Sequence, residues 1–346
     1  MGITRRQFIQ SVGATSILGI DSFSISQVLA MPLNYVWRTG AELATPIQEI
    51  YPAVFDGEIF VGGGFVPKTD SIFYGLSPTT NIYIYNPHTQ TWRLGPVLPE
   101  ARHHLGMVSN NRFLYGMGGF YGVKGNAWQI KDTVLRLTKK SHEWEDGPSL
   151  PMPMAESIYA SIKDNIHVVG GKTLDQNAKK SVDLARHFVL VDNNKWEEAA
   201  PASVSRSSAT SAVLNDNLYV IGGRQYGKLS RNLGYAEVYD EKIDKWKSIS
   251  PLPVPLAGLA ATVLNGKIFV TGGEAFGSNG HWKTGRVFQQ VWVYDPDRDL
   301  WERERDMPEA RHGHGSVTIN DSIYVIGGGS KVGPQGTRAS LLVFSQ

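Results

Sequence analysis

Short runs of alternating apolar and polar residues recur along the chain and predict β-strands rather than helices. The segment SVTINDSIYVIGG, residues 316–328, contains two such runs separated by Asn320-Asp321. Asn215-Asp216 and Asn265-Gly266 occupy the same place in two earlier segments. These residue types tolerate the left-handed backbone of tight turns, so each segment predicts a β-hairpin.

Tryptophan and glycine recur along the chain with a fixed spacing. A Gly-Gly pair follows each of six tryptophans at a distance of 26 residues, and these are Trp37, Trp92, Trp144, Trp196, Trp246 and Trp301. The distance from a Gly-Gly pair to the next tryptophan varies between 24 and 29 residues. One part of the repeat is therefore fixed architecture, and the other part holds loops of differing length.

Each repeat predicts four antiparallel strands, a to d. The hairpin supplies strands a and b, a variable loop follows the Gly-Gly pair, and strand c is typified by residues 291–294. Strand d carries the tryptophan. Repeats of roughly 50 residues with paired glycines and a later aromatic residue resemble kelch repeats, which stack radially into a β-propeller. The resemblance extends from about residue 34 to the end of the chain and implies an all-β fold.

The two ends of the repeat array complement each other. The last Gly-Gly pair has no following tryptophan, whereas Trp37 has no preceding Gly-Gly pair. The strand NYVWR around Trp37 is therefore predicted to pair with residues 341–344 and to complete the last blade. This closure would remove two exposed sheet edges. Residues 31–346 are accordingly predicted to form one six-bladed kelch β-propeller, with tryptophans and glycines packed between blades.

The first thirty residues differ in character from the repeats. Arg5-Arg6 precede Phe8, a mildly apolar run follows, and VLA at residues 28–30 has the small residues of a cleavage site. This order resembles a bacterial twin-arginine signal and implies cleavage after Ala30 and a periplasmic or secreted protein. The alternative is a basic N-terminus with a short apolar stretch. No other run approaches about 18 apolar residues, which argues against a membrane span.

The absence of cysteine restricts the chemistry that is possible. Disulfides and thiolate metal sites are excluded. Some kelch-like proteins are copper radical oxidases, whose cofactor requires a tyrosine cross-linked to cysteine, and this chain cannot form it. No serine nucleophile motif, phosphate-binding loop or HExxH zinc motif is present. We therefore expect neither a cofactor nor a metal.

The loops between strands b and c are expected to share one face with the connections between blades. They span residues 65–82, 120–132, 172–187, 224–236, 274–290 and 329–340. They hold 14 Lys or Arg and five Asp or Glu, a net charge of +9, whereas the whole chain carries +2. A basic rim predicts an anionic ligand. The alternative is a solvated surface whose lysines point outward, and the predicted export argues against nucleic acid as the ligand.

Three repeats place an arginine sixteen residues before the Gly-Gly pair, namely Arg102, Arg206 and Arg311. Arginine holds carboxylates through paired hydrogen bonds, so these three are candidate ligand-binding residues. The alternative is that they tie down the turns between blades. His104 and Glu156 lie two residues beyond this position in their own repeats and should reach the channel mouth. Glu156 is a further ligand-binding candidate, and His104 is a candidate acid-base residue.

The loop TGGEAFGSNGHWKTGRVFQQVWVYD resembles the corresponding loop of bacterial sialic acid mutarotases, which are exported six-bladed kelch propellers. The resemblance lies in Glu274, Gly277 and Arg286. It implies that Glu274 is the acid-base residue of an N-acetylneuraminate epimerase and that Arg286 binds the substrate carboxylate. The loop is longer here, so the spacing from Glu274 to Arg286 does not match. Arg224, in GGRQYGKLSR of the preceding repeat, is a further candidate for anion binding.

Two classes of function follow from these observations. The first is a propeller that binds an anionic glycan, small molecule or partner protein on its basic rim without catalysis. The second is a sugar mutarotase of the N-acetylneuraminate type. The enzyme would need Glu274 to face the channel mouth with an acid-base partner within hydrogen-bond reach, whereas a binding protein needs only exposed aromatic residues and arginines.

Overall fold

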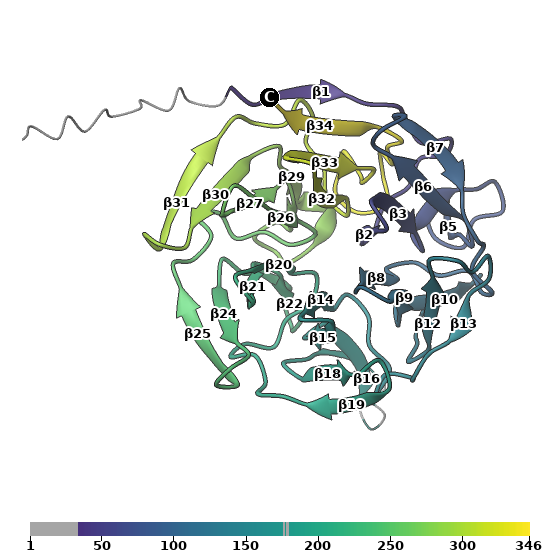
Figure 1. Cartoon of the computed structure of the whole chain (residues 1–346), viewed down its shortest axis with the longest axis horizontal. Helices are drawn as coiled ribbons and strands as arrows, with labels where there is room; N and C mark the ends of the chain where they lie inside the picture. The colour runs from purple at the N-terminus through teal and green to yellow at the C-terminus, as the bar shows by residue number, and fades with distance from the viewer. Residues whose placement is uncertain (1–33, 176, 178–179) are drawn as a thin grey trace, which may run out of the picture. The chain divides into compact units, whose positions relative to one another are not determined.

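A computed structural model describes residues 34–175, 177 and 180–346. The predicted export signal, residues 1–30, lies outside the described residues. Residues Tyr35–Gln346 form one compact unit. Within this unit, six four-stranded antiparallel sheets are arranged radially around a central channel (Figure 1). The predicted six-bladed β-propeller is therefore confirmed.

The first three blades follow one another along the chain and have the strand order a-b-c-d from the channel outward. Blade 1 contains β2 (Ala53–Phe55), β3 (Glu58–Gly62), β6 (Ile82–Asn86) and β7 (Thr91–Leu94). Blade 2 contains β8 (Gly106–Ser109), β9 (Phe113–Met117), β12 (Val134–Thr138) and β13 (Glu145–Asp146). Blade 3 contains β14 (Ile158–Ile162), β15 (Asn165–Val169), β18 (His187–Val191) and β19 (Lys195–Glu198).

The last three blades have the same strand order, and blade 6 combines strands from both ends of the chain. Blade 4 contains β20 (Thr210–Leu214), β21 (Asn217–Ile221), β24 (Ala236–Asp240) and β25 (Lys245–Ile249). Blade 5 contains β26 (Ala260–Leu264), β27 (Lys267–Thr271), β30 (Val291–Asp295) and β31 (Leu300–Glu304). Blade 6 contains β32 (Gly315–Ile319), β33 (Ser322–Ile326), β34 (Leu341–Ser345) and β1 (Val36–Thr39).

The ring is closed by β1, which pairs antiparallel with β34. Trp37 lies opposite Phe344 in this pairing, and the centroids of their rings are 4.8 Å apart. The N-terminal strand therefore supplies the outer strand of the last blade, as the unmatched ends of the repeat array predict.

The repeated tryptophans join neighbouring blades by hydrogen bonds as well as by packing. Each indole nitrogen donates to a backbone carbonyl in the connection that leaves the preceding blade. The six pairs are Trp37 with Arg305, Trp92 with Ala41, Trp144 with Pro96, Trp196 with Pro148, Trp246 with Ala200 and Trp301 with Ser250, at 2.7–3.2 Å. Both the size and the polar N–H of tryptophan are thus used at this position.

The Gly-Gly pairs lie where the connection into the next blade passes closest to the sheet. Gly272 has a φ of +59°, and a Cβ atom there would collide with the carbonyl oxygen of Arg311. The adjacent Gly273 donates its N–H to that same carbonyl at 2.9 Å. Only glycine combines the positive φ with so close an approach of two backbones.

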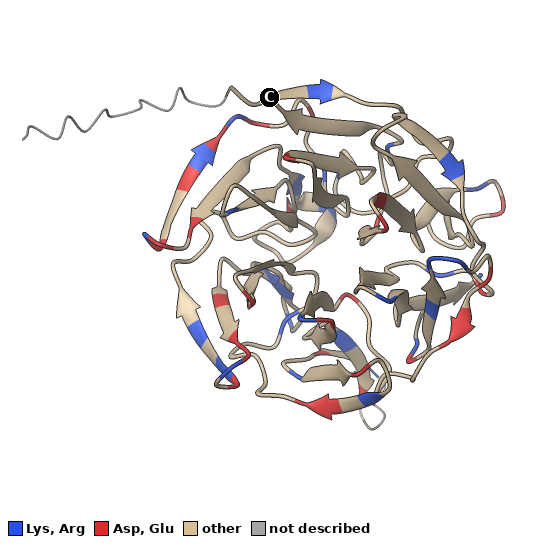
Figure 2. Ribbon diagram, viewed as in Figure 1, with Lys and Arg blue, Asp and Glu red and all other residues tan. Residues whose placement is uncertain are grey.

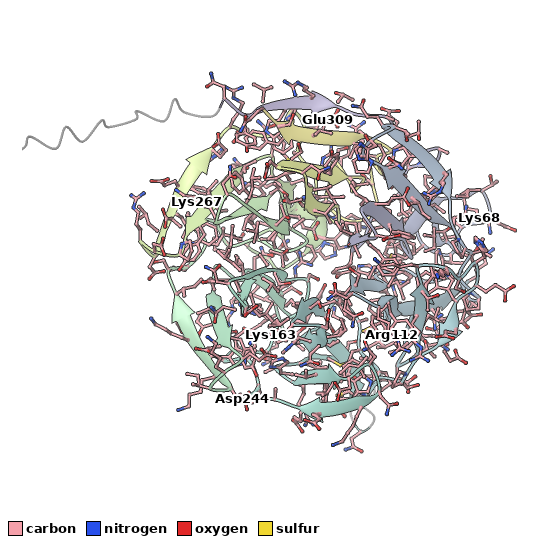
Figure 3. All side chains as sticks on the ribbon, in the orientation of Figure 1. Lys68, Arg112, Lys163, Asp244, Lys267 and Glu309 are labelled. Atoms are coloured by element: carbon pink, nitrogen blue, oxygen red, sulfur yellow. The ribbon has the colours of Figure 1, made fainter. Side chains whose placement is uncertain are left out.

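Apolar side chains fill the spaces between neighbouring blades, and charge lies mainly on outer strands and loops. Figure 3 shows side chains packed between adjacent sheets, and Figure 2 shows Lys, Arg, Asp and Glu concentrated on outer strands such as β19, β25 and β31. One core cluster between blades 4 and 5 includes Ile221, Val270 and Tyr294. Across the described ranges, no helix is both long enough and apolar enough to span a membrane.

Most of the loops between strands b and c form small two-stranded hairpins that stand on one face of the propeller. These are β4–β5 (Phe65–Pro67, Leu76–Pro78), β10–β11 (Phe120–Val123, Asn126–Ile130), β16–β17 (Lys172–Asp175, Lys180–Asp183), β22–β23 (Arg224–Gln225, Arg231–Asn232) and β28–β29 (Glu274–Ala275, Arg286–Val287). The blade 5 loop also contains a 3-10 turn, η1 (Trp282–Thr284). These hairpins surround the channel mouth.

Candidate functional site

A belt of six residues encircles the channel where each connection enters the inner strand of a blade. All six have a left-handed backbone with φ between 51° and 59°, and they are Glu49, His104, Glu156, Ser208, Gly258 and Gly313. Backbone hydrogen bonds join successive members, for example from Gly258 N to Ser208 O at 2.9 Å. The strained conformation is thus held by contacts between blades, and it turns the side chains of the belt toward the channel.

Above this belt, on the face that carries the hairpins, lies a cavity of about 280 Å³, here called the mouth cavity. Its walls are largely aromatic, and they include Phe65, Phe73, Trp128, Tyr226, Phe276 and Trp282. Its polar lining comprises Gln48, Glu49, His104, Glu156, Ser208, Arg224, Ser230, Glu274, His281 and His312. An apolar wall around a few convergent polar groups is typical of a small-molecule site.

Two of the predicted residues form an ion pair inside the mouth cavity. Nη2 of Arg224 lies 2.8 Å from Oε1 of Glu274, and the side chains are 4% and 8% exposed. The guanidinium carbon lies 3.4 Å from the centroid of the Phe276 ring. Gly333 donates its backbone N–H to Oε2 of Glu274 at 3.3 Å. Glu274 therefore faces the cavity, as predicted, but its arginine partner is Arg224.

Glu156 is held as a carboxylate by two partners. Nζ of Lys172 lies 3.2 Å from Oε1, and Ser208 donates its hydroxyl to Oε2 at 2.5 Å. Burial alone would raise the pKa of Glu156. Attraction to Lys172 and His104, the Ser208 hydrogen bond and attraction to Arg224 reverse this effect and lower the pKa to about 2.

The hydrogen bonds of His103 and His104 require a proton between His104 and Glu49. His103 Nε2 lies 2.8 Å from the carbonyl oxygen of Ala127, which can only accept, so this nitrogen carries the hydrogen. Burial, together with repulsion by His104, lowers the pKa of His103 well below its usual value and keeps the ring neutral. His103 Nδ1 then accepts from His104 Nδ1 at 2.8 Å. His104 Nε2 faces Oε2 of Glu49 at 3.1 Å, a contact that needs one further proton.

His312 makes the same arrangement on the other side of Glu49. Its Nε2 lies 2.9 Å from the carbonyl oxygen of Lys331 and is therefore the donor. Its Nδ1 lies 3.6 Å from Oε1 of Glu49 and 3.5 Å from Oε2 of Glu274. Burial would raise the pKa of Glu49, but attraction and hydrogen bonding to His104, aided by His312, lower it. Two histidines and two carboxylates, His104, Glu49, His312 and Glu274, thus lie in a row with successive polar atoms 3.1, 3.6 and 3.5 Å apart.

The structure corrects the role predicted for Arg102, Arg206 and Arg311, because these side chains do not line the mouth cavity. Arg206 is 1% exposed and bonds the carbonyls of Gly222 and Tyr235. The other two make equivalent internal contacts: Arg102 pairs with Glu100 and Thr133, and Arg311 with Gly327, Glu309 and Ser340. They tie the connections between blades to the start of strand c, which is the alternative reading of their sequence position.

Burial is so complete at Arg311 that it lowers the pKa of the guanidinium to about 10, although Glu309 opposes the shift. Arg286 is also absent from the cavity wall. It lies on β29, is exposed, and stacks over Phe288 with the guanidinium carbon 4.8 Å from the ring centroid. In the β28–β29 pairing Arg286 lies opposite Ala275, one position from the Glu274–Val287 pair. Because successive side chains of a strand point to opposite faces, Arg286 points away from the face on which Glu274 lines the cavity.

The outer part of the hairpin face is basic, although the cavity floor is not. Lys172 and Arg224 are paired with buried carboxylates. Six exposed lysines of the same loops have no ion pair among the described residues, and these are Lys68, Lys124, Lys180, Lys228, Lys283 and Lys331. The predicted excess of positive charge therefore lies around the entrance of the mouth cavity.

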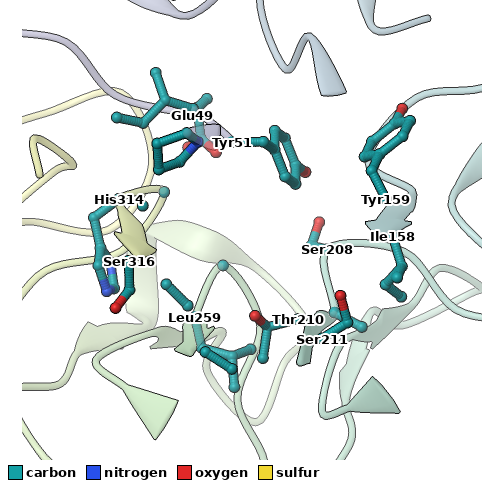
Figure 4. A pocket seen from close by; sticks show the side chains of 18 of the residues that line it. Glu49, Tyr51, Ile158, Tyr159, Ser208, Thr210, Ser211, Leu259, His314 and Ser316 are labelled. Atoms are coloured by element: carbon teal, nitrogen blue, oxygen red, sulfur yellow. The ribbon is translucent and has the colours of Figure 1, made fainter. Parts of the chain in front are cut away.

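Beneath the belt the channel continues as a narrower hollow of about 120 Å³. Figure 4 shows the hydroxyls of Ser208, Thr210 and Ser211 around this hollow, with Tyr51 and Tyr159 on another side. The rings of Tyr51 and Tyr159 meet edge to face at 5.8 Å. Glu49, Ser208 and Gly258 line both the hollow and the mouth cavity, so the two spaces meet at the belt.

Four of the eight site residues predicted from the sequence line the mouth cavity, namely Glu274, His104, Arg224 and Glu156. The sequence prediction was incomplete. It missed Lys172, whose position directly after a Gly-Gly pair matches those of Arg224 and Glu274 and could have revealed it. It also gave no site role to Glu49, which occupies the same repeat position as His104 and Glu156, or to His312, which occupies the same repeat position as His103. Among the described residues, no group of three or more His, Asp or Glu side chains is arranged to hold a metal ion.

Comparison with known families identifies the class of protein. The family described as the KLHDC2/KLHL20/DRC7 Kelch-repeats domain matches residues 146–329, more than half of the chain. The chain therefore belongs to the kelch-repeat family. Kelch-like protein terF of Aspergillus terreus is 28% identical over 316 residues, which cover 87% of this chain and 66% of that protein. Kelch-like protein 23 of Homo sapiens is 25% identical, over 74% of this chain and 42% of that protein.

The chain thus spans less than two thirds of the length of these relatives. Among solved structures, one titled "Structure of YjhT" has a TM-score of 0.73 and 15% sequence identity. The match covers 88% of this chain and 96% of that one. This likeness shows that the two chains share a fold.

Proposed function

We propose that this kelch propeller is exported by the signal in residues 1–30 and binds an anionic sugar in the mouth cavity. The observation that carries the proposal is the composition of this cavity. Aromatic walls suit the apolar faces of a sugar ring, and buried carboxylates and imidazoles at the floor suit its hydroxyl groups. Its volume of about 280 Å³ favours a ligand of monosaccharide size over a segment of a partner protein.

The anionic character of the ligand is supported by the exposed lysines around the entrance and by Arg224 in the wall. Nη1 of Arg224 makes only a 3.4 Å contact with the hydroxyl of Tyr226, so one edge of the guanidinium is weakly engaged. A ligand carboxylate that reaches this edge would gain a charged hydrogen bond, worth about 1.5–3 kcal/mol. The lysines would increase the rate of encounter.

The test compares N-acetylneuraminate with its neutral methyl ester by isothermal titration calorimetry. The acid should bind about tenfold or more tightly than the ester, and its affinity should fall as salt rises from 50 to 500 mM, roughly a threefold decrease in Debye length. Equal affinities of the acid and the ester at low salt would show that the site does not recognise the charge.

A second candidate function, mutarotation of the same sugar, is favoured by the row of two histidines and two carboxylates. Glu274 faces the cavity with Nδ1 of His312 at 3.5 Å, and Glu49 has His104 at 3.1 Å. Each of the two glutamates thus has a histidine nearby that could serve as its acid-base partner. Apo geometry of this kind often tightens when a substrate binds.

In this reaction Glu274 would accept the proton of the anomeric hydroxyl, while the proton held between His104 and Glu49 would pass to the ring oxygen. The bond between the anomeric carbon and the ring oxygen breaks, and the open-chain keto acid forms. Rotation and reclosure on the opposite face, with both proton transfers reversed, give the other anomer. No other reactant is consumed.

Exchange NMR of the anomers of N-acetylneuraminate, with and without the protein, tests this candidate. A mutarotase should raise the exchange rate in proportion to protein concentration. Glu274→Gln should abolish the increase and keep most of the affinity, because glutamine is nearly isosteric with glutamate. An exchange rate equal to that in buffer would leave binding alone as the function.

A further inference from the structure

A second hollow adjoins the mouth cavity between the loops of blades 3, 4 and 5. It is an open groove of about 930 Å³ whose lining includes Lys180, Ser181, Gln225, Arg231, Asn232 and Ser278. We infer that this groove is a second subsite for a further, acidic sugar unit, so that the preferred ligand is an oligosaccharide. The inference rests on the proposed function and names its ligand class.

The groove and the mouth cavity share one border. Tyr226, Ser230 and Phe276 line both spaces, so a ligand in the cavity can continue over these residues into the groove. Tyr226 is 42% exposed at this border, although Nζ of Lys172 lies 3.6 Å from the centroid of its ring. A partly exposed aromatic residue between the two hollows is suited to packing against a sugar while the sugar's hydroxyls reach polar groups on both sides.

The blade 5 loop restricts extension of the ligand out of the mouth cavity along the channel axis. The ring of Trp282 meets that of Tyr74 from blade 1, with centroids 6.0 Å apart. A Cβ atom on Gly333 of blade 6 would lie 2.7 Å from the Trp282 ring. Loops of blades 1, 5 and 6 are therefore in contact at Trp282, so an additional sugar unit would extend sideways, toward the groove.

The charges of the groove determine what the second unit should carry. Lys180 is exposed and makes no ion pair among the described residues, and Arg231 donates only to the neutral amide of Gln225, at 2.6 Å. The one carboxylate in the lining, Asp183, already accepts from Ser207 Oγ and Tyr226 N. The two cations are thus available to an acidic group on the ligand.

The test uses calorimetric titration with N-acetylneuraminate and with its α2,8-linked dimer. The wild type should bind the dimer about tenfold more tightly than the monomer, as expected for one extra charged contact. Ser278→Trp fills the groove from an exposed position and should remove this preference, with the monomer affinity unchanged. Thr89→Trp, exposed in the c-d turn of blade 1 on the opposite face, is the matched control and should keep the preference.

Each outcome has a defined meaning. If wild type binds both sugars with equal affinity, or if Ser278→Trp keeps the preference for the dimer, the groove is not a subsite and the proposed function stands. If wild type binds neither sugar, the proposed function fails, and the inference fails with it. Loss of the preference in Ser278→Trp alone supports the subsite.

Discussion

Arg224 donates from Nη2 to Oε1 of Glu274 at 2.8 Å and thereby joins blade 4 to blade 5 within the wall of the mouth cavity. Both side chains are almost completely buried, and the charge of Glu274 raises the pKa of Arg224 against the effect of burial. The ion pair fixes the orientation of the glutamate that the proposed chemistry uses. It also makes each partner dependent on the other for its stability in the fold.

Replacing one residue of this ion pair should therefore reduce the stability of the fold more than replacing both. Arg224→Leu leaves Glu274 buried without a cation and should lower the free energy of unfolding by about 3–5 kcal/mol. Urea denaturation of the single variants and of the double variant Arg224→Leu/Glu274→Met measures this. The double variant should be more stable than the sum of the single losses implies, because no unpaired charge remains. Additive losses would show that the two charges act independently.

Arg311 should contribute to stability and not to ligand binding. Its guanidinium is buried and bonds Gly327 and Ser340, so Arg311→Ala should lower the free energy of unfolding by roughly 2–4 kcal/mol. The affinity for N-acetylneuraminate, measured by calorimetry on the folded protein, should stay within about twofold of wild type. Full stability together with reduced affinity in this variant would show that Arg311 takes part in ligand binding.

Stability should fall in mild acid because of a buried histidine pair in blade 3. Nδ1 of His167 lies 2.9 Å from Nε2 of His187, and burial lowers the pKa of both rings to about 4. In the unfolded chain both titrate near 6.5, so the neutral pair stabilises the fold fully above pH 6.5, and this contribution is lost as the pH falls to 4. The carboxylate of Glu241, 3.8 Å from His167 Nε2, reduces the loss.

The expected decrease is about 1–3 kcal/mol, since each pKa unit corresponds to about 1.4 kcal/mol and the pair is coupled. Urea denaturation at pH 7, 6, 5 and 4 provides the measurement. The variant His167→Leu/His187→Leu should show a smaller decrease across this range, and the buried rings of His103 and His314, whose pKa values burial also lowers, account for what remains. The same slope in the variant as in wild type would assign the pH dependence to other groups.

Export should depend on the paired arginines in the first residues of the chain. Replacing Arg5 and Arg6 with lysine keeps the charge and removes the twin-arginine motif, so precursor should accumulate in the cytoplasm of a bacterial host. Fractionation followed by immunoblotting measures this, with wild type as the reference. Mature protein in the periplasm at wild-type levels would contradict the proposed signal.

The fold could be predicted because its determinants recur in the sequence. The step of 26 residues from each tryptophan to a Gly-Gly pair reflects two contacts that every blade repeats: an indole hydrogen bond to the preceding blade and a close backbone approach by the next. The unmatched Trp37 even indicated how the ring closes. Because every blade repeats these contacts, the tertiary arrangement could be predicted from the spacing of residues in the sequence.

The site was only partly predictable, because spacing does not reveal the direction of a side chain. Arg206 lies two residues before Ser208 of the belt, yet its guanidinium turns to the carbonyls of Gly222, just after strand b, and Tyr235, just before strand c. Conversely, the contact of His312 with Glu49 joins residues more than 250 positions apart. Such pairings arise from closure of the ring and have no signature in a single repeat.

The central claim, that the mouth cavity binds an anionic sugar, is tested most directly by calorimetric titration of N-acetylneuraminate into wild type and Trp128→Ala. Trp128 lies in the aromatic wall and is 43% exposed, so its loss should leave the fold intact. Leu94→Ala, exposed on β7 outside the cavity lining, is the control. We expect one sugar per chain in wild type and in the control, and an affinity about tenfold or more weaker in Trp128→Ala. Absence of binding to wild type, or equal affinity in all three proteins, would contradict it.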